Sequence, residues 1–238
     1  MRAGFPGFPE EGIQFFRALA KNNKRDWFQP RKHIYEQQVK QPMRDLVAAV
    51  NAAMTDFAPG HVTDPDKAIY RIYRDTRFSK DKTPYKDHIA AHFPWRWSGR
   101  HDGAGYYFAI SHKEVAVGGG VYMPTPEILL ALRNHIASQH AQLRKLTAVP
   151  AVRKLLGELQ GDRLSRVPKG FAADHPAADL LRLKYFVLYV VLPPELATTK
   201  ALFREIVKRF QAMAPVIDFL NTPLAPAKKK IDARELLL

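Results

Sequence analysis

The sequence contains no cysteine. This absence excludes disulfide bonds, cysteine-ligated zinc and iron–sulfur sites, and thiol nucleophiles. The sequence also lacks any run of about 18 apolar residues, the length that marks a membrane-spanning helix. Its first residues have no continuous apolar core of a secretory signal, because Pro6 and Pro9 interrupt them. We therefore expect a soluble, cytoplasmic protein with no membrane partner.

Motifs of several enzyme classes are missing as well. The chain has no GxGxxG, GxxxxGK[S/T], HExxH or GxSxG pattern. Gly118–Gly120 precede Val-Tyr-Met-Pro rather than a helix start, which indicates close backbone packing instead of a phosphate-binding loop. His88 and His92 would share one face of a strand but lie about 13 Å apart, at roughly 3.3 Å per residue. We expect no metal site and no cofactor.

Positive charge, by contrast, is abundant. The chain has 37 lysines and arginines against 23 acidic residues, which gives a formal net charge of +14 over 238 residues. An excess of this size favours an anionic partner. That partner is either a small molecule with a phosphate or carboxylate group, or a nucleic acid.

Hydrophobic periodicity predicts helices in the N- and C-terminal parts of the chain and strands between them. Helices are expected over residues 10–21, 25–39 with a break at Pro30, 42–53, from Thr125 onward, 143–146, 150–159, 179–183 and 199–213. Strands are expected over residues 68–74, 88–93, 105–111, 114–121 and 185–192, the last being the most apolar and therefore central.

This order of elements favours an α+β fold. We expect a single domain over residues 1–222, with an antiparallel or mixed central sheet of about five strands packed against N- and C-terminal helices. Residues 223–238 include three consecutive lysines and are expected to form a basic, flexible tail.

The densest polar stretch runs from Arg71 to Lys86, between two of the expected strands, and holds six bases and two acids. Loops held by a rigid sheet often carry function. We predict an anion site whose ligand-binding residues are Arg74, Arg77, Ser79, Lys80, Lys82, Thr83 and Lys86. Three further residues are candidates for catalysis or for orienting the bases, namely Asp75, Asp81 and Tyr85. The alternative is a solvated loop whose acids and bases pair with one another.

The string Arg-Phe-Ser-Lys-Asp-Lys-Thr-Pro-Tyr-Lys, residues 77–86, resembles the signature of an uncharacterised bacterial and fungal family, the domain of unknown function 2461. Similar features lie at Asn22-Asn23, Trp27-Phe28, Gly105-Tyr106-Tyr107, Gly118-Gly119-Gly120 and Pro168-Lys169-Gly170. The resemblance covers about residues 8–220 and implies a single domain. It brings no established reaction, cofactor or catalytic residue.

Three functions remain open at this point. The first is an enzyme or a binding protein that takes an anionic ligand at the Arg74–Lys86 loop. The second is a sequence-tolerant nucleic-acid-binding protein, in which Trp95 and Trp97 stack on bases beside Arg96, Arg100 and His101. The third is an adaptor whose signature loop supports the fold. Two local features have a structural and a functional interpretation: Arg96 packed on tryptophan would stabilise the fold, and Asn22-Asn23 either end a helix or form a wall of the site.

Overall fold

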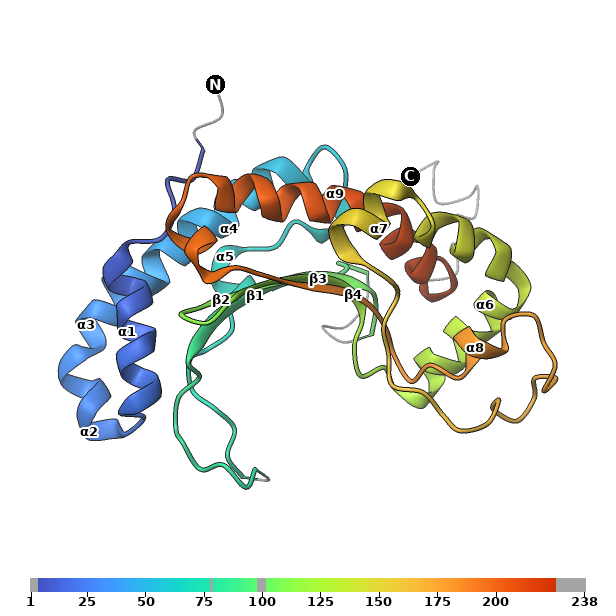
Figure 1. The fold of residues 1–238 in the computed structure, drawn as a ribbon, viewed down its shortest axis with the longest axis horizontal. Helices are drawn as coiled ribbons and strands as arrows, with labels where there is room; N and C mark the ends of the chain where they lie inside the picture. The colour runs from blue at the N-terminus through green and yellow to red at the C-terminus, as the bar shows by residue number, and fades with distance from the viewer. Residues whose placement is uncertain (1–3, 78, 98–101, 226–238) are drawn as a thin grey trace, which may run out of the picture.

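The computed structural model describes residues 4–77, 79–97 and 102–225. Its strands form one antiparallel sheet, with β1 (His88–Phe93), β2 (Gly105–Ser111), β3 (Val115–Val121) and β4 (Phe186–Leu192) in the order β1-β2-β3-β4. Helices surround this sheet (Figure 1). The predicted α+β class is confirmed, although the sheet has four strands rather than about five.

The expected strand over residues 68–74 is wrong. Helix α5 (Pro65–Ala68) occupies its start, with the carboxylate of Asp64 capping the helix. The chain then touches the edge of β1, where Ile69 forms an isolated bridge with Ala91. It leaves that edge after Tyr70, whose N–H donates to the carbonyl of Ala90. This segment thus contacts the sheet, but it forms no continuous ladder of hydrogen bonds with β1.

The expected central position of β4 is also wrong, because β4 lies at an edge of the sheet. Its apolar sequence reflects two apolar faces. Phe186 and Leu188 are buried, whereas Val191 on the other face is 51% exposed. The outer edge of β4 is covered in part by Gln160, which exchanges two backbone hydrogen bonds with Val187 at 2.7 and 3.0 Å.

The N-terminal helices follow the sequence closely. Helix α1 (Glu10–Lys21) has its predicted bounds. The pattern over residues 25–39 is broken near Pro30, as expected, into α2 (Arg25–Phe28), η1 (Gln29–Arg31), α3 (Lys32–Ile34) and η2 (Tyr35–Lys40). Helix α4 (Gln41–Met54) continues directly from η2, and the short turn η3 (Pro59–His61) comes before α5.

The C-terminal half adds the remaining helices. Helix α6 (Pro126–Thr147) begins at the predicted cap, where the hydroxyl of Thr125 accepts from the N–H of Ile128. The helix is kinked at Gln139, where φ is −125° and ψ is 22°, and the separate helix expected over residues 143–146 lies within the part after this kink. The others are α7 (Pro150–Leu156), α8 (Ala178–Leu181), η4 (Pro194–Thr198), α9 (Ala201–Asn221) and η5 (Thr222–Leu224). None of the helices in the described ranges combines the length and apolarity that a membrane crossing requires.

Helix α9 lies along one face of the sheet, together with α4 (Figure 1). Residues of this face, such as Phe108 and Val117, are fully buried. Gly119 allows the approach of α9, since a Cβ atom there would lie 2.5 Å from the sulfur of Met213. The close packing predicted for Gly118–Gly120 is therefore confirmed.

The opposite face of the sheet is not covered by α9. In Figure 1 it forms the roof of an arch, with helices α1–α3 on one side and α6, α8 and the segment before α8 on the other. Small side chains form a second apolar cluster on this face, namely Ala90, Ala109 and Ala116, against which Tyr70 and Tyr107 pack.

Candidate functional site

Residues 71–86, here called the signature hairpin, form two arms that project from the sheet beside α1 (Figure 1). Tyr73 and Tyr85 form a bridge between the arms. Two backbone hydrogen bonds flank it, from the N–H of Arg74 to the carbonyl of Pro84 at 2.9 Å and from Lys86 to Ile72 at 2.8 Å. Phe78 lies outside the described residues. The predicted loop is thus an ordered hairpin near its base.

The base of the signature hairpin is fixed by Asn23 and Phe28. The side-chain amide of Asn23 donates to the carbonyl of Tyr85 at 2.9 Å, and its oxygen accepts from the N–H of Tyr85 at 3.1 Å. The Tyr85 ring is only 1% exposed and stacks on Phe28 with centroids 4.1 Å apart. Burial raises the pKa of the Tyr85 hydroxyl, so this group stays protonated at neutral pH.

One acid of the signature hairpin pairs with the base two residues later. The guanidinium of Arg77 donates two hydrogen bonds to the Asp75 carboxylate, at 3.0 and 2.7 Å. These hydrogen bonds lower the pKa of Asp75 to about 2. Both side chains are exposed, at 76% for Arg77 and 45% for Asp75. This pair therefore fits the alternative interpretation of the sequence, a solvated loop whose acids and bases pair with one another.

The other acid joins the two arms. Asp81 accepts from the guanidinium of Arg74 and, at 2.9 Å, from the N–H of Thr83. The same Arg74 nitrogen donates to the Thr83 hydroxyl at 2.6 Å. The Thr83 N–H and then Arg74 lower the pKa of Asp81 to about 2. With such a pKa, Asp81 is a weak base, and its contacts fix the direction of Arg74.

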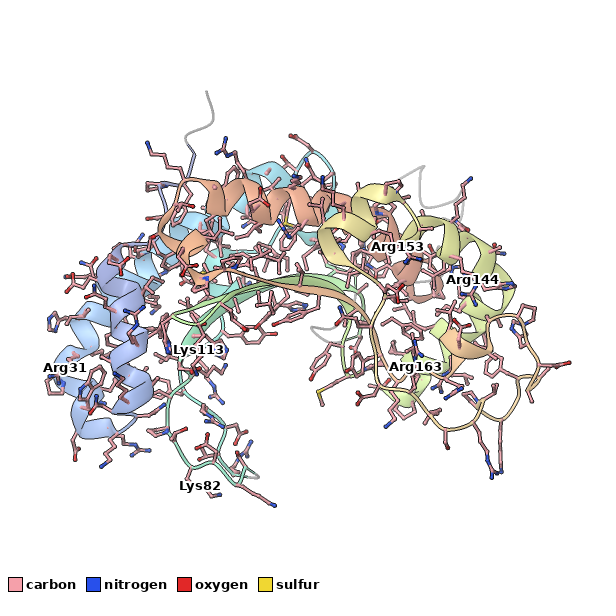
Figure 2. All side chains as sticks on the ribbon, in the orientation of Figure 1. Arg31, Lys82, Lys113, Arg144, Arg153 and Arg163 are labelled. Atoms are coloured by element: carbon pink, nitrogen blue, oxygen red, sulfur yellow. The ribbon has the colours of Figure 1, made fainter. Side chains whose placement is uncertain are left out.

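The bases predicted to bind one anion do not all converge. Arg77 turns to Asp75, and the Lys82 ammonium donates to the carbonyl of Thr76 at 2.9 Å near the far end of the hairpin (Figure 2). Arg74 and Lys86 line a common hollow instead. Ser79, Lys80, Arg77 and Lys82 are not among the residues that line it. Of the predicted ligand-binding residues, Arg74, Thr83 and Lys86 thus lie together.

This hollow, here called the hairpin hollow, has a volume of about 530 Å³ and lies between α1, the signature hairpin, the start of β1 and the β2–β3 turn. All three catalytic candidates, Asp75, Asp81 and Tyr85, contribute to its wall. The remaining lining residues are Ala20, Asn23, Arg74, Thr83, Lys86, Asp87, His88 and Lys113.

Lys113 lines the hairpin hollow from outside the signature hairpin, and two further cations lie near the β2–β3 turn. The Lys113 ammonium, in the β2–β3 turn, lies 2.9 Å from a carboxylate oxygen of Asp87. Burial acts to raise the pKa of Asp87, but hydrogen bonds from Lys113 and His88 outweigh it and the pKa is lowered. Burial and then the positive charge of Lys113 lower the pKa of the neighbouring His112, with smaller contributions from Arg17 and Lys21 of α1.

Sequence reasoning missed these cations because they are distant along the chain. The one advance signal was at Asn22-Asn23, which were expected either to end a helix or to form a wall of the site. Asn22 ends α1, and Asn23 forms part of the wall of the hairpin hollow.

The other sequence candidates have structural roles. Trp95 and Trp97 contact edge to face at 5.4 Å, and the Arg96 guanidinium lies 4.2 Å from the Trp97 ring centroid. This arrangement supports the stabilising interpretation; Arg100 and His101 lie outside the described residues. Within the described ranges, no three histidine or acidic side chains gather in a way that could hold a metal ion.

Comparison with known families identifies the chain. The model of a family described as "Conserved hypothetical protein (DUF2461)" matches residues 11–219, so the chain belongs to this family. No curated protein and no solved structure shows significant similarity to it.

Proposed function

We propose that this DUF2461 protein binds a small ligand with a phosphate or carboxylate group in the hairpin hollow. The observation that supports this best is the convergence of Lys86 and Lys113 on one hollow from two separate elements. Arg74 reaches the same hollow, and Arg17 and Lys21 add positive charge beside the β2–β3 turn. Bases from two elements that meet at one concave place are typical of an anion site.

Acidic residues in the wall do not argue against this ligand. Asp81 holds Arg74 in place, so that this guanidinium needs no reorganisation when an anion arrives. Asp87 pairs with Lys113 in a partly exposed ion pair. Because such pairs contribute little to stability, an incoming phosphate can take over Lys113 at small cost. The acids thus orient the bases, and catalysis is not part of the proposal.

Titration calorimetry with inorganic phosphate and with citrate tests the proposal. Replacing either lysine of the hollow, in Lys86→Ala or Lys113→Ala, should weaken binding of the preferred anion about tenfold or more, because one charge-assisted hydrogen bond is lost. Lys82→Ala is the matched control, since Lys82 belongs to the same hairpin but not to the hollow. Equal losses in all three variants, or no binding by the wild type, would overturn the proposal.

A further inference from the structure

A row of aromatic side chains crosses the sheet on the face away from α9. The strand register places His92 opposite Tyr107, Tyr107 opposite Gly118, and Gly118 opposite Tyr189, so the row includes one residue of each strand. The next row on this face contains only Ala90, Ala109, Ala116 and Val191. Tyr70 and Tyr107 pack against the three alanines, and Ala109 also lines a hollow beside Tyr107 and Tyr189.

Gly118 shapes this row. A Cβ atom at Gly118 would lie 2.9 Å from Cδ2 of Tyr189, closer than side chains tolerate. The Tyr189 ring therefore leans over β3 towards Tyr107. Tyr189 is 36% exposed, so the ring presents surface to a ligand rather than closing a core.

The aromatic row is continuous with the hairpin hollow. A second hollow of about 290 Å³, here called the sheet hollow, is lined by Tyr107, Tyr189 and Glu114, among others. It shares three residues with the hairpin hollow, namely Asp87, His88 and Lys113. Figure 2 shows Lys113 at this end of the sheet. Lys86 extends the connection, with its ammonium 5.1 Å from the ring centroid of Tyr70.

From this continuity we infer that the ligand is a nucleoside phosphate, with its base on Tyr107 and Tyr189 and its phosphate at Lys86 and Lys113. This inference rests on the proposed function, which supplies the phosphate half. Stacking on tyrosine accepts any planar base. The two hollows together have the size usual for a site of this kind. The Glu114 carboxylate repels phosphate and offers an acceptor for a ribose hydroxyl or a base amino group, which sets the orientation.

Charge and shape favour a free nucleotide over a strand of nucleic acid. The cations lie at one end of the aromatic row, around the hairpin hollow, where a single phosphate group can meet them. A strand would need bases spaced along a groove that follows its backbone.

The test compares adenosine monophosphate with ribose 5-phosphate by titration calorimetry, since the two differ only in the base. The wild type should bind the nucleotide about tenfold more tightly, the usual effect of one stacked base. Tyr189→Leu, which keeps an apolar side chain without the ring, should remove that advantage and leave ribose 5-phosphate binding unchanged. Tyr107→Leu extends the test to the second ring.

Tyr122→Leu is the matched control. Tyr122 is 61% exposed and contacts Tyr185, and it lines neither hollow. The Tyr122→Leu variant should bind both compounds as the wild type does. Circular dichroism verifies that each variant is folded.

The outcomes separate the two proposals. Equal affinity for the nucleotide and the sugar phosphate in the wild type overturns the nucleotide inference and leaves the anion site intact. Failure of both compounds to bind overturns the nucleotide inference, and it overturns the anion site as well only if inorganic phosphate and citrate also fail to bind. An eight-nucleotide single strand that binds far more tightly than the mononucleotide, with the tyrosine dependence retained, also overturns the inference in favour of nucleic acid.

Discussion

The side-chain amide of Asn23 pairs with the backbone of Tyr85 through both of its polar groups, although 62 positions separate the two residues. Asn23 thereby pairs with the backbone of the second arm of the signature hairpin as a neighbouring strand would. Its contact joins the segment after α1 to the signature hairpin. The hairpin hollow lies between these two elements, so its shape depends on this contact.

Replacing Asn23 with alanine should lower the free energy of unfolding by about 2 kcal/mol, because the Tyr85 N–H and carbonyl lose their partner in a largely buried place. Urea unfolding of the two proteins measures this difference. Asn22→Ala is the matched control, since the Asn22 amide only donates to the carbonyl of Ala18 and is exposed. Equal losses in the two variants would show that the Tyr85 contact is not special.

Gly120 is constrained more than its position in a strand suggests. Its φ is +136°, and a Cβ atom would lie 2.1 Å from the carbonyl oxygen of Phe186. Gly120→Ala should therefore destabilise the fold by about 3 kcal/mol or more. Gly157 also has a positive φ, +74°, but open space around it. Gly157→Ala should lose only the backbone strain, about 1–3 kcal/mol. Urea unfolding measures the loss in the free energy of unfolding for each variant. Similar losses for Gly120→Ala and Gly157→Ala would contradict the steric argument.

Local signals in the sequence predicted much of the fold. The periodicity of residues 10–21 gave α1 its bounds, and the Thr125-Pro126-Glu127 sequence gave the start of α6. Pro30 marked the break among the N-terminal helices. Each of these signals acts within a few residues along the chain, which is why sequence reasoning detects it.

The errors concern relationships between distant segments. The apolar composition of β4 could not distinguish an edge strand with two apolar faces from a central strand. The Ile–Tyr pattern over residues 68–74 predicted contact with the sheet, but not where the chain leaves it. In the candidate site, too, the contacts between distant segments were missed. The signature hairpin was recognised, whereas Asn23, which pairs with Tyr85, and Lys113, which pairs with Asp87, lie at least 25 positions away from those partners in the sequence.

Asp75 and Asp81 offer a test of whether the acids of the hollow orient its bases. Each substitution to asparagine removes one negative charge from the wall, but only Asp81→Asn removes the partner of Arg74. We expect Asp81→Asn to weaken phosphate binding and Asp75→Asn to leave it unchanged or strengthen it slightly. Calorimetry provides the affinities. Tighter phosphate binding in both variants would show that net charge alone governs the site.

The same Asp75→Asn variant also addresses stability. The Asp75–Arg77 pair is exposed on both sides, and exposed ion pairs contribute little to folding. The midpoint of urea unfolding should therefore stay where it is in the wild type. A clear fall in that midpoint would assign the pair a supporting role in the fold.

His61 makes stability depend on pH. Its side chain is 3% exposed, and burial lowers its pKa from 6.5 to about 4, although hydrogen bonds to the carbonyls of Phe93 and Pro94 act in the opposite direction. Between these two values the unfolded chain binds a proton that the folded protein does not, so stability falls as the pH falls through this window. The contribution of His61 should be about 2 kcal/mol between about pH 7 and pH 5.

Urea unfolding of the wild type and of His61→Gln across this window isolates the effect. His112 and His135, whose pKa values are also lowered by burial, titrate in both proteins and cancel in the comparison. The glutamine variant starts from a lower stability at neutral pH, because it loses the ring contact with Tyr106. Its stability should nevertheless fall less steeply on acidification, by about 1.4 kcal/mol per pH unit at most. Parallel curves for the two proteins would mean that His61 takes up its proton without unfolding, and that its burial does not limit acid stability.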